Sequence, residues 1–316
     1  MSLNISVIIP VYNAAEFLEN AVNSALQFEE VKEILLIEDK STDHSLLVCQ
    51  KLSDNNDKIK LFQHADKGNH GAGATRNLGL EKASHDFIAF LDADDYYLPN
   101  RFDAERELFN DKKIEGVFGA IGVDFLSEKG KQEFERKFKN NTLTTVNYHA
   151  EGNDIFLGLL RLSPKQFGVF FSLIGLTIRK SALERSGLRF NEELRVHQDT
   201  DFNLKLSYLC HLKTGIIDKP VSIRGVHDDN RITKIKPYSA QFYNNIFKLY
   251  TSLYFWSKSV PEMNKKAIKV IRLRHLSFKI ANMKGIKKYL YFAYSALTSP
   301  VFAKTEYRFH ALKKLK

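Results

Sequence analysis

Residues 87–95 read Phe87-Ile88-Ala89-Phe90-Leu91-Asp92-Ala93-Asp94-Asp95, and this stretch decides the fold. Its first five residues form an unbroken apolar run, as a strand buried on both faces requires. The three carboxylates that follow repel one another unless a cation lies among them. Open α/β sheets bind their ligands at the carboxyl ends of such strands. Oxygen ligands suit Mg²⁺ or Mn²⁺, and Mg²⁺ usually binds together with substrate phosphates, so the stretch predicts a divalent metal held against a phosphorylated substrate.

The chain before this stretch alternates between strand-like and helix-like patterns. Apolar runs predict strands at residues 5–9, 33–37 and 59–62, and helical spacing predicts helices near 17–26, 43–52 and 71–83. This alternation is typical of right-handed βαβ units and predicts an α/β fold with a mixed, mostly parallel sheet. Asn13 is expected to cap the first helix, and one of Ser41, Thr42 and Asp43 is expected to cap the second.

The pattern is less regular after Pro99. The sequence predicts a helix at 101–110, a strand at 116–126, a buried strand or strand pair at 168–178, a helix at 180–186 stopped by Gly187, a helix at 199–212 and a strand at 221–226. From Tyr238 onward the pattern is helical, with breaks near Pro261, Gly285 and Pro300.

The charge of the chain is unevenly distributed. The 316 residues carry a net charge of +10, yet residues 231–316 contain 19 Lys and Arg against two acids, Glu262 and Glu306. This asymmetry predicts a basic, aromatic-rich helical extension at 231–316, attached to an acidic body at 1–230. Within the body we expect a nucleotide-binding half at 1–98 and an acceptor half at 99–230.

The cysteines and the apolar segments bear on the compartment. Cys49 and Cys210 have neither metal-ligand nor redox spacing, and no basic-plus-apolar leader precedes the first strand. The longest mostly apolar stretch, residues 167–178, is shorter than the roughly twenty residues that a membrane-spanning helix needs. The sequence therefore predicts a cytoplasmic protein without a transmembrane segment.

Three polar side chains near the predicted sheet edge are candidates for ligand binding. Tyr12 either stacks on a flat base or packs on the sheet edge. Asp39 is suited to accept a hydrogen bond from the imide N–H of a uracil-like base. Arg76 suits a diphosphate, although a solvated helix face or an ion pair to a carboxylate is the alternative. Residues 71–76 lack the third small residue of a dinucleotide-binding loop, so dehydrogenase chemistry is not expected.

Four blocks of the sequence resemble the ordered motifs of the family 2 inverting glycosyltransferases. The blocks are Pro10-Val11-Tyr12-Asn13, Glu38-Asp39-Lys40-Ser41-Thr42-Asp43, Gly73-Ala74-Thr75-Arg76-Asn77 and Leu91-Asp92-Ala93-Asp94-Asp95. The resemblance covers the first hundred residues and implies a GT-A fold that binds a nucleotide-diphospho-sugar and a divalent metal at an Asp-x-Asp site. It implies nucleotide-binding roles for Pro10, Val11, Tyr12, Asn13, Asp39, Arg76, Asp92 and Ala93. It further implies that Asp94 ligates Mg²⁺ or Mn²⁺ directly and that Asp92 contacts the ribose or the metal.

The resemblance continues more loosely into the acceptor half. In Arg195-Val196-His197-Gln198-Asp199-Thr200-Asp201-Phe202, Asp199 matches the position of the family's catalytic base, and Gln198 replaces the usual glutamate. The alternative is that Asp199 and Asp201 only complement the helix dipole. Residues 224–230 resemble the family's late loop, which implies that His227 is a metal ligand.

The resemblance implies an activity. We expect metal-dependent transfer of a sugar, with inversion, from a nucleotide-diphospho-sugar to an acceptor hydroxyl, with Asp199 as the base. A UDP-sugar is favoured as donor, the acceptor is a saccharide or a lipid-linked saccharide, and the setting is cell-surface polysaccharide or glycolipid synthesis. Two alternatives are a phosphatase of the haloacid-dehalogenase type with Asp92 as nucleophile, and an inactive, membrane-associated sugar-nucleotide-binding protein.

The basic extension at 231–316 has two interpretations. An aromatic segment at 238–256 precedes a basic one at 265–274, and a basic amphipathic helix binds anionic lipid, which would place the protein peripherally on the cytoplasmic face of the membrane. Alternatively, these helices pack on the body with a solvated basic face. Nucleic acid is not expected as a partner, because no recognition motif accompanies the charge.

Overall fold

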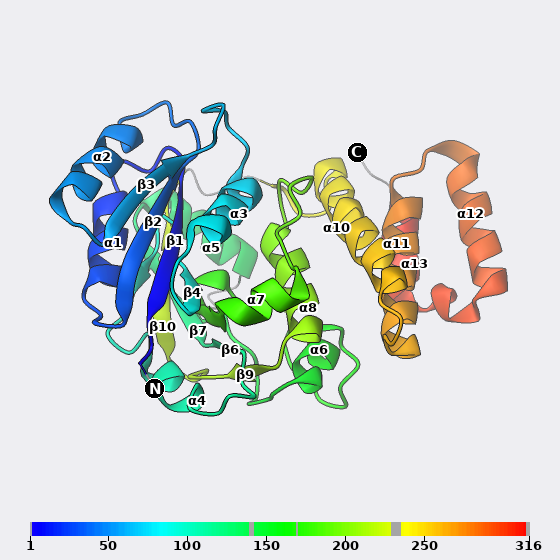
Figure 1. Cartoon of the computed structure of the whole chain (residues 1–316). Helices are drawn as coiled ribbons and strands as arrows, with labels where there is room; N and C mark the ends of the chain where they lie inside the picture. Colours follow the sequence, from blue (N-terminus) through cyan, green and yellow to red (C-terminus); the bar gives the residue numbers. More distant parts are fainter. Residues whose placement is uncertain (1, 139–141, 169, 229–234, 314–316) are drawn as a thin grey trace.

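The central sheet is built around the strand that ends at the acidic stretch. The computed structural model describes residues 2–138, 142–168, 170–228 and 235–313, and the sheet has the strand order β3-β2-β1-β4-β8-β6-β9 (Figure 1). These strands are β3 (Ile59–Gln63), β2 (Val31–Glu38), β1 (Ile5–Val11), β4 (Phe87–Phe90), β8 (Leu176–Arg179), β6 (Gly116–Phe118) and β9 (Leu212–Thr214). Only β8 runs antiparallel to its neighbours, so the predicted α/β fold with a mixed, mostly parallel sheet is confirmed.

Helices cover both faces of this sheet, which explains why its strands are apolar throughout. Helices α1 (Leu18–Leu26) and α2 (Ser45–Asn55) lie on one face, and α3 (Ala72–Lys82) lies on the other (Figure 1). Along β1, Val7 and Ile9 join the core under α1, whereas Ile8 joins the core under α3. Burial of both faces is what continuous apolar runs predict for a parallel sheet.

A smaller sheet lies beside the end of β4 and carries the late loop. It consists of β5 (Tyr96–Tyr97), β10 (Pro220–Val226) and β7 (Ala120–Phe125), in that order. The single strand predicted at 116–126 was wrong, because Gly119 separates β6 from β7 and the two strands belong to different sheets. A Cβ atom at Gly119 would lie 2.9 Å from Val221 Cγ2 and 3.0 Å from the Ile216 carbonyl oxygen, so glycine allows these residues to approach closely between the two strands.

Two other boundaries also differ from the sequence prediction. Within the segment predicted as a strand or strand pair at 168–178, residues Leu173–Gly175 form a 3₁₀ turn, and of the residues described there only those of β8 form a strand. The helix predicted at 199–212 is α8 (Gln198–Leu209), and the chain returns to the sheet as β9. By contrast, α7 (Lys180–Ser186) ends as predicted at Gly187, which has the left-handed φ of +62°. The described part of the body also contains the helices α4 (Asp103–Leu108), α5 (Glu128–Phe138) and α6 (Asn153–Leu159).

Among the described residues after 234, four α-helices lie against the acceptor half of the body. They are α10 (Ala240–Ser259), α11 (Lys265–Ala281), α12 (Gly285–Thr298) and α13 (Thr305–Leu312), with breaks at the predicted positions (Figure 1). Leu249 and Leu253 of α10 share a buried apolar cluster with Leu204 of α8 and Phe156 of α6. The extension thus has a packed interface with the body. The predicted boundary at residues 230 and 231 lies outside the described residues.

No helix of the described residues combines the length and the apolar composition that crossing a bilayer demands.

Candidate functional site

The loops after β1 and β2 are joined by side-chain hydrogen bonds. Asn13 has a left-handed φ of +50°, and its Oδ1 accepts a hydrogen bond of 2.7 Å from the Thr42 amide. The Asn13 amide donates to Ser41 Oγ at 3.1 Å. The prediction that Asn13 caps a helix was therefore wrong: α1 begins at Leu18, and the Asn13 side chain orders the neighbouring loop instead.

The motif Pro10-Val11-Tyr12-Asn13 and the start of α2 lie next to these contacts. Pro10 and Val11 end β1, whereas Tyr12 follows them with 51% of its surface exposed. None of the three predicted caps occupies the cap position of α2, which is His44. Asp43 nevertheless accepts the amide of Ser45, the first residue of α2, at 2.9 Å.

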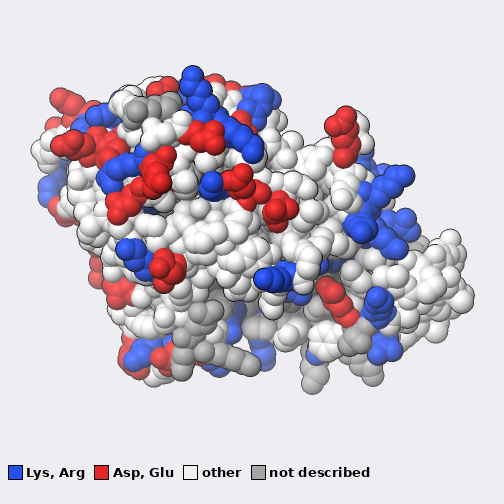
Figure 2. All heavy atoms as spheres, turned by 90° about the horizontal axis from the view of Figure 1, so that it is seen from below, with Lys and Arg blue, Asp and Glu red and all other residues white. Residues whose placement is uncertain are grey.

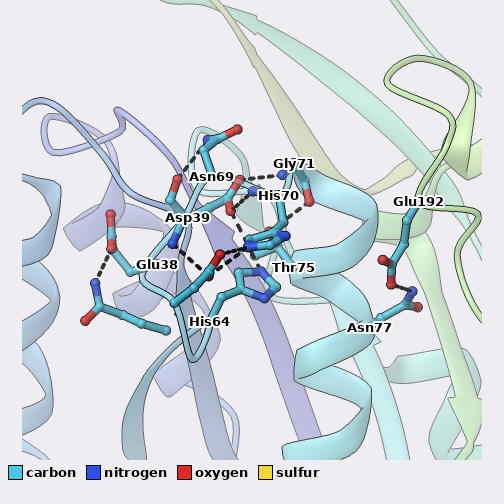
Figure 3. Close-up of polar contacts among 12 residues, drawn as sticks. Glu38, Asp39, His64, Asn69, His70, Gly71, Thr75, Asn77 and Glu192 are labelled. Carbon is cyan, nitrogen blue, oxygen red and sulfur yellow. Dashed lines mark hydrogen bonds and ion pairs between the residues drawn. The ribbon is translucent and has the colours of Figure 1, made fainter.

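Asp39 orders the loop that enters α3. Its two carboxylate oxygens accept the backbone amides of His70 and Gly71 at 2.7 and 2.8 Å, and its carbonyl accepts Asn69 Nδ2 at 2.8 Å (Figure 3). The side chain of Asp39 is almost fully buried. Because each carboxylate oxygen has a second lone pair, both retain acceptor capacity after these bonds.

Arg76 forms an ion pair with the first aspartate of the acidic stretch. Its Nη2 lies 2.5 Å from Asp92 Oδ1, and its guanidinium lies 5.6 Å from the centre of the Phe190 ring. The Arg76 side chain is 8% exposed and that of Asp92 is 39% exposed. Of the roles considered for Arg76, the ion pair to a carboxylate is present, and it compensates the charge of Asp92 beside Asp94.

The three carboxylates of the acidic stretch point to different partners. Asp94 Oδ2 lies 3.1 Å from His227 Nε2. Asp95 is buried, and its Oδ1 accepts the amide of Gly225 at 3.0 Å. Burial raises the pKa of the Asp95 carboxyl well above its usual range, and the charges of Asp94 and Asp92 act in the same direction. The expectation that all three carboxylates surround a cation was therefore wrong for Asp95, which ties the stretch to β10.

The contact between Asp95 and β10 brings His227 to Asp94. His227 follows β10 directly, and its ring lies 4.7 Å from that of Phe17. Gly225 is required at its position because a Cβ atom there would overlap the Asp94 carbonyl oxygen. The sequence suggested His227 only through the resemblance; the structure places it beside Asp94 despite the 133 residues between them.

The Asp94–His227 pair has the chemistry of a partial metal site. A carboxylate oxygen and an imidazole nitrogen together suit Mn²⁺, and the carboxylate also suits Mg²⁺. Among the described residues, no group of three or more His, Cys, Asp or Glu side chains could hold a metal ion. A metal held here would complete its shell from water and substrate phosphates, as Mg²⁺ commonly does. The residues present therefore fit a divalent ion that binds together with a diphosphate.

Asp199 lies in the first turn of α8. Its Oδ1 accepts the Thr200 amide at 2.8 Å, and the preceding His197 has a left-handed φ of +66°. The positive end of the helix dipole stabilises a carboxylate at this position. Gln198 is buried, donates to the Leu194 carbonyl, and lies against Gly73, where a Cβ atom would be 2.7 Å from its Nε2. Gln198 thus joins α8 to α3.

Asp201 has a different role from Asp199. Its side chain is fully buried and pairs with Lys205 Nζ at 2.6 Å, and Lys205 also donates to Ser252 Oγ of α10 at 3.0 Å. Burial raises the pKa of the Asp201 carboxyl, and the charge of Lys205 opposes this shift. Asp201 therefore connects α8 with the extension rather than merely complementing the helix dipole.

Asn77 is a residue whose structural role the sequence did not indicate. Its Nδ2 donates to the Phe190 carbonyl at 3.0 Å and to Glu192 Oε1 at 2.8 Å, while its Oδ1 accepts the Phe190 amide at 2.8 Å (Figure 3). These bonds fix α3 to the segment before α8. Their partners are 113 and 115 residues away, so no local pattern signals them.

Comparisons with known proteins agree with this arrangement. A family model described as glycosyl transferase family 2 matches residues 6–174. The chain spans 40% or less of the length of the first six curated relatives, which are 31–40% identical over the aligned residues. The GalNAc(5)-diNAcBac-PP-undecaprenol beta-1,3-glucosyltransferase of Campylobacter jejuni is 30% identical over 202 residues, which are 62% of this chain and 57% of that protein.

Two solved structures share the fold. The S. aureus TarS fragment 1-349, in complex with UDP-GlcNAc, has a TM-score of 0.58 at 19% identity, covering 91% of this chain and 78% of that fragment. The mannosyltransferase PcManGT of Pyrobaculum calidifontis, in complex with GDP-Man and Mn²⁺, has a TM-score of 0.54 at 13% identity, covering 98% of this chain and 83% of that protein. These likenesses show the fold alone.

Proposed function

The chain belongs to glycosyl transferase family 2, and from this premise we propose that it transfers a sugar from a nucleotide-diphospho-sugar to an acceptor hydroxyl with inversion. The observation that carries the proposal is the Asp94–His227 pair at the carboxyl end of β4, beside Asp92 and its partner Arg76. A family match that covers more than half of the chain supports glycosyl transfer over the phosphatase alternative. The ion pair of Asp92 with Arg76 also makes Asp92 a poor nucleophile.

The nucleotide of the donor is proposed to bind over the loops that follow β1 and β2. Tyr12 offers an exposed ring for stacking on the base, and Asp39 keeps lone pairs for the imide N–H. Pro10, Val11 and Asn13 would complete this side of the nucleotide site, with Ala93 beneath it. UDP is proposed as the nucleotide because an acceptor-only carboxylate complements uracil N3–H. Guanine N1–H is a donor of the same kind, so the comparison of UDP with GDP below tests this choice.

The divalent ion is proposed to be Mg²⁺ or Mn²⁺, held by Asp94 and His227, with Asp92 contacting the ribose or the metal. When bound, the ion would stabilise the negative charge that develops on the departing nucleoside diphosphate. Arg76 compensates part of the negative charge of this cluster, which would favour the approach of a diphosphate.

Asp199 is proposed to act as the general base. Its carboxylate would take the proton from the acceptor hydroxyl while the hydroxyl oxygen bonds to the anomeric carbon and the bond to the diphosphate oxygen breaks. Attack on the face opposite the leaving group inverts the anomeric configuration. The position of Asp199 in the first turn of α8 supports this role, because the helix dipole stabilises its anionic form.

Nucleotide-dependent thermal stabilisation tests the donor assignment. We expect UDP with Mn²⁺, at about a hundredfold excess over Kd, to raise the Tm by about 5 °C or more, because a ligand that binds only the folded state stabilises it by about 2.7 kcal/mol. GDP with Mn²⁺ and UDP with EDTA should each give a smaller shift. An equal or larger shift with GDP would contradict the choice of uridine. Transfer or hydrolysis of a UDP-sugar in the same samples would separate an active enzyme from an inactive binding protein.

The acceptor is proposed to be a saccharide on a lipid carrier, in the synthesis of a cell-surface polysaccharide or glycolipid. The C. jejuni relative, whose name contains an undecaprenol-linked saccharide, supports this choice. The surface of α12 supports it independently. Six residues form one outward stripe at helical spacing: Ile286, Tyr289, Leu290, Ala293, Tyr294 and Leu297.

Helix α12 therefore has the reverse of the usual arrangement, with apolar side chains outside and a lysine inside. Lys288 is buried and donates to the carbonyls of Ala281 and Lys313 at 3.2 and 2.5 Å. Figure 2 shows Lys and Arg gathered on the extension, with uncharged atoms covering its outer end. An exposed apolar stripe with a basic surround complements an anionic bilayer surface, and no acid of α12 opposes this contact.

Flotation with lipid vesicles tests the membrane contact. The triple variant Ile286→Ser, Leu290→Ser, Leu297→Ser should bind vesicles of phosphatidylcholine and phosphatidylglycerol about tenfold or more weakly than the wild type, because each exposed aliphatic side chain contributes about 1 kcal/mol or more on burial. Phe255→Ser, which removes an exposed aromatic side chain from α10, is the matched control and should bind normally. Unchanged binding of the triple variant, or a wild-type dimer that the triple variant abolishes, would contradict a lipid-facing α12.

A further inference from the structure

A cavity of about 250 Å³ lies between α8, the helix that carries Asp199, and the helical extension. From the body, α8 contributes Thr200, Asn203 and Leu204 to its wall. The extension contributes Tyr250 of α10, Arg274 of α11 and Tyr307 of α13. The cavity is therefore closed by a part of the chain that lies beyond the residues matched by the family model.

The cavity extends along α8 from the first turn, where the proposed base is located. Thr200 follows Asp199 directly, and the Asp199 carboxylate accepts the Thr200 amide. Asn203 is four residues after Asp199, and residues at this spacing share one face of a helix. Asp199 is not itself among the lining residues, so a molecule bound in the cavity would begin one residue along α8 from the proposed base.

One buried polar atom in the wall lacks a partner. Asn203 is only 2% exposed, and its Nδ2 donates to the Phe171 carbonyl at 2.8 Å. Its Oδ1 has no hydrogen-bond partner among the described residues. Leaving a buried acceptor unpaired costs about 1–3 kcal/mol. This oxygen is shielded from the cavity, so a ligand that donates an O–H or N–H would recover that free energy once the Asn203 side chain turns toward it.

A buried cation faces the same cavity from α11. The Arg274 side chain is 14% exposed, and its contacts are long: 3.3 Å to Tyr250 OH, 3.3 Å to the Leu160 carbonyl and 3.8 Å from Nε to Glu306 Oε1. A guanidinium has five N–H donors, more than these contacts use. The Tyr250 ring, which is stacked on Phe278 at 5.5 Å, provides a rigid apolar wall beside it.

We propose that this cavity binds a sugar unit of the acceptor, so that α10, α11 and α13 determine acceptor specificity. The inference rests on the proposed glycosyl transfer and on Asp199 as its base. A sugar fits the combination of aromatic and aliphatic walls with a few fixed polar groups, since its hydroxyls both donate to Asn203 Oδ1 and accept from Arg274. A lipid chain does not fit, because it would leave both polar groups unpaired.

Saturation-transfer NMR with a panel of methyl α- and β-pyranosides tests the proposal in the presence of UDP and Mn²⁺. At least one glycoside should bind the wild type, and Asn203→Leu and Arg274→Gln should each weaken that binding about tenfold or more. Arg272→Gln, which changes an exposed arginine of the same helix, is the matched control and should bind like the wild type.

The Kd of UDP with Mn²⁺, measured by calorimetry on the same variants, distinguishes the two proposals. If the wild type fails to bind UDP, the proposed function fails; if it binds UDP but no glycoside, only the acceptor site fails. Glycoside binding that persists in both variants would also overturn the site. Should Asn203→Leu not fold, as judged by circular dichroism, Arg274→Gln and the more conservative Asn203→Ser give the same test.

Discussion

Replacing Asp199 with asparagine is expected to lower the rate of sugar transfer by about 10²–10⁴-fold, the contribution of a general base. The change is nearly isosteric, and the amide oxygen can still accept the Thr200 amide, so the first turn of α8 should be retained. Asparagine cannot take the proton of the acceptor hydroxyl. The measurement is kcat for transfer from a UDP-sugar, together with the Kd of UDP and Mn²⁺, which should not change.

Two other aspartates serve as controls for this variant. Asp154 also lies in the first turn of a helix, α6, and Asp154→Asn should leave transfer unchanged. Asp201→Asn breaks the buried pair with Lys205 and should lower the Tm. If Asp199→Asn retains wild-type turnover, Asp199 is not the base. If it loses UDP binding as well as transfer, its role is structural.

Replacing Asp94 with alanine is expected to weaken UDP binding in the presence of Mn²⁺ by about 100-fold or more. The side chain supplies the carboxylate of the Asp94–His227 pair. Loss of a residue that hydrogen-bonds to a metal ligand lowers metal affinity about 10–100-fold, and loss of a ligand itself should lower it at least as much. In EDTA, the wild type and Asp94→Ala should bind UDP equally weakly, because the difference arises through the metal. Calorimetric titration under both conditions measures this.

The control for this second variant is an exposed carboxylate away from the site. Asp103 lies in the first turn of α4, and its side chain is half exposed, so Asp103→Ala should bind UDP and Mn²⁺ like the wild type. His227→Gln should weaken metal-dependent binding less than Asp94→Ala, because the carboxylate remains. Metal-dependent binding that is unchanged in Asp94→Ala would contradict its role as a ligand.

The parallel core of the fold was predictable because its signals are local. The apolar run before Asp92 and the strand and helix patterns that precede it can each be recognised within a short window of sequence. Burial of both sheet faces requires apolar residues along these strands. The prediction failed where a single residue changes the path of the chain. Gly119 divides one apolar run between two sheets, and only contact with the distant residues Ile216 and Val221 reveals this.

The candidate site was predictable as a set of motifs but not as a set of contacts. The sequence suggested Asp92, Asp94 and His227 as metal-site residues, and it treated Asp95 only as one of three carboxylates that repel one another without a cation. The structure separates them: the Gly225 amide holds Asp95, and this bond brings His227 to Asp94. Such long-range pairing depends on how β10 packs beside β5, which no local pattern encodes.

The central claim is that Asp94 and His227 jointly hold a divalent ion that contacts the diphosphate of the donor. Pulsed electron paramagnetic resonance of the protein with Mn²⁺ and UDP tests it directly, because Mn²⁺ reports each nucleus in its coordination shell. The wild type should show ³¹P couplings from the diphosphate and a ¹⁴N coupling from imidazole, and His227→Gln should lose the ¹⁴N coupling while keeping ³¹P. A spectrum without ³¹P coupling, or a ¹⁴N coupling that persists in His227→Gln, would contradict the claim.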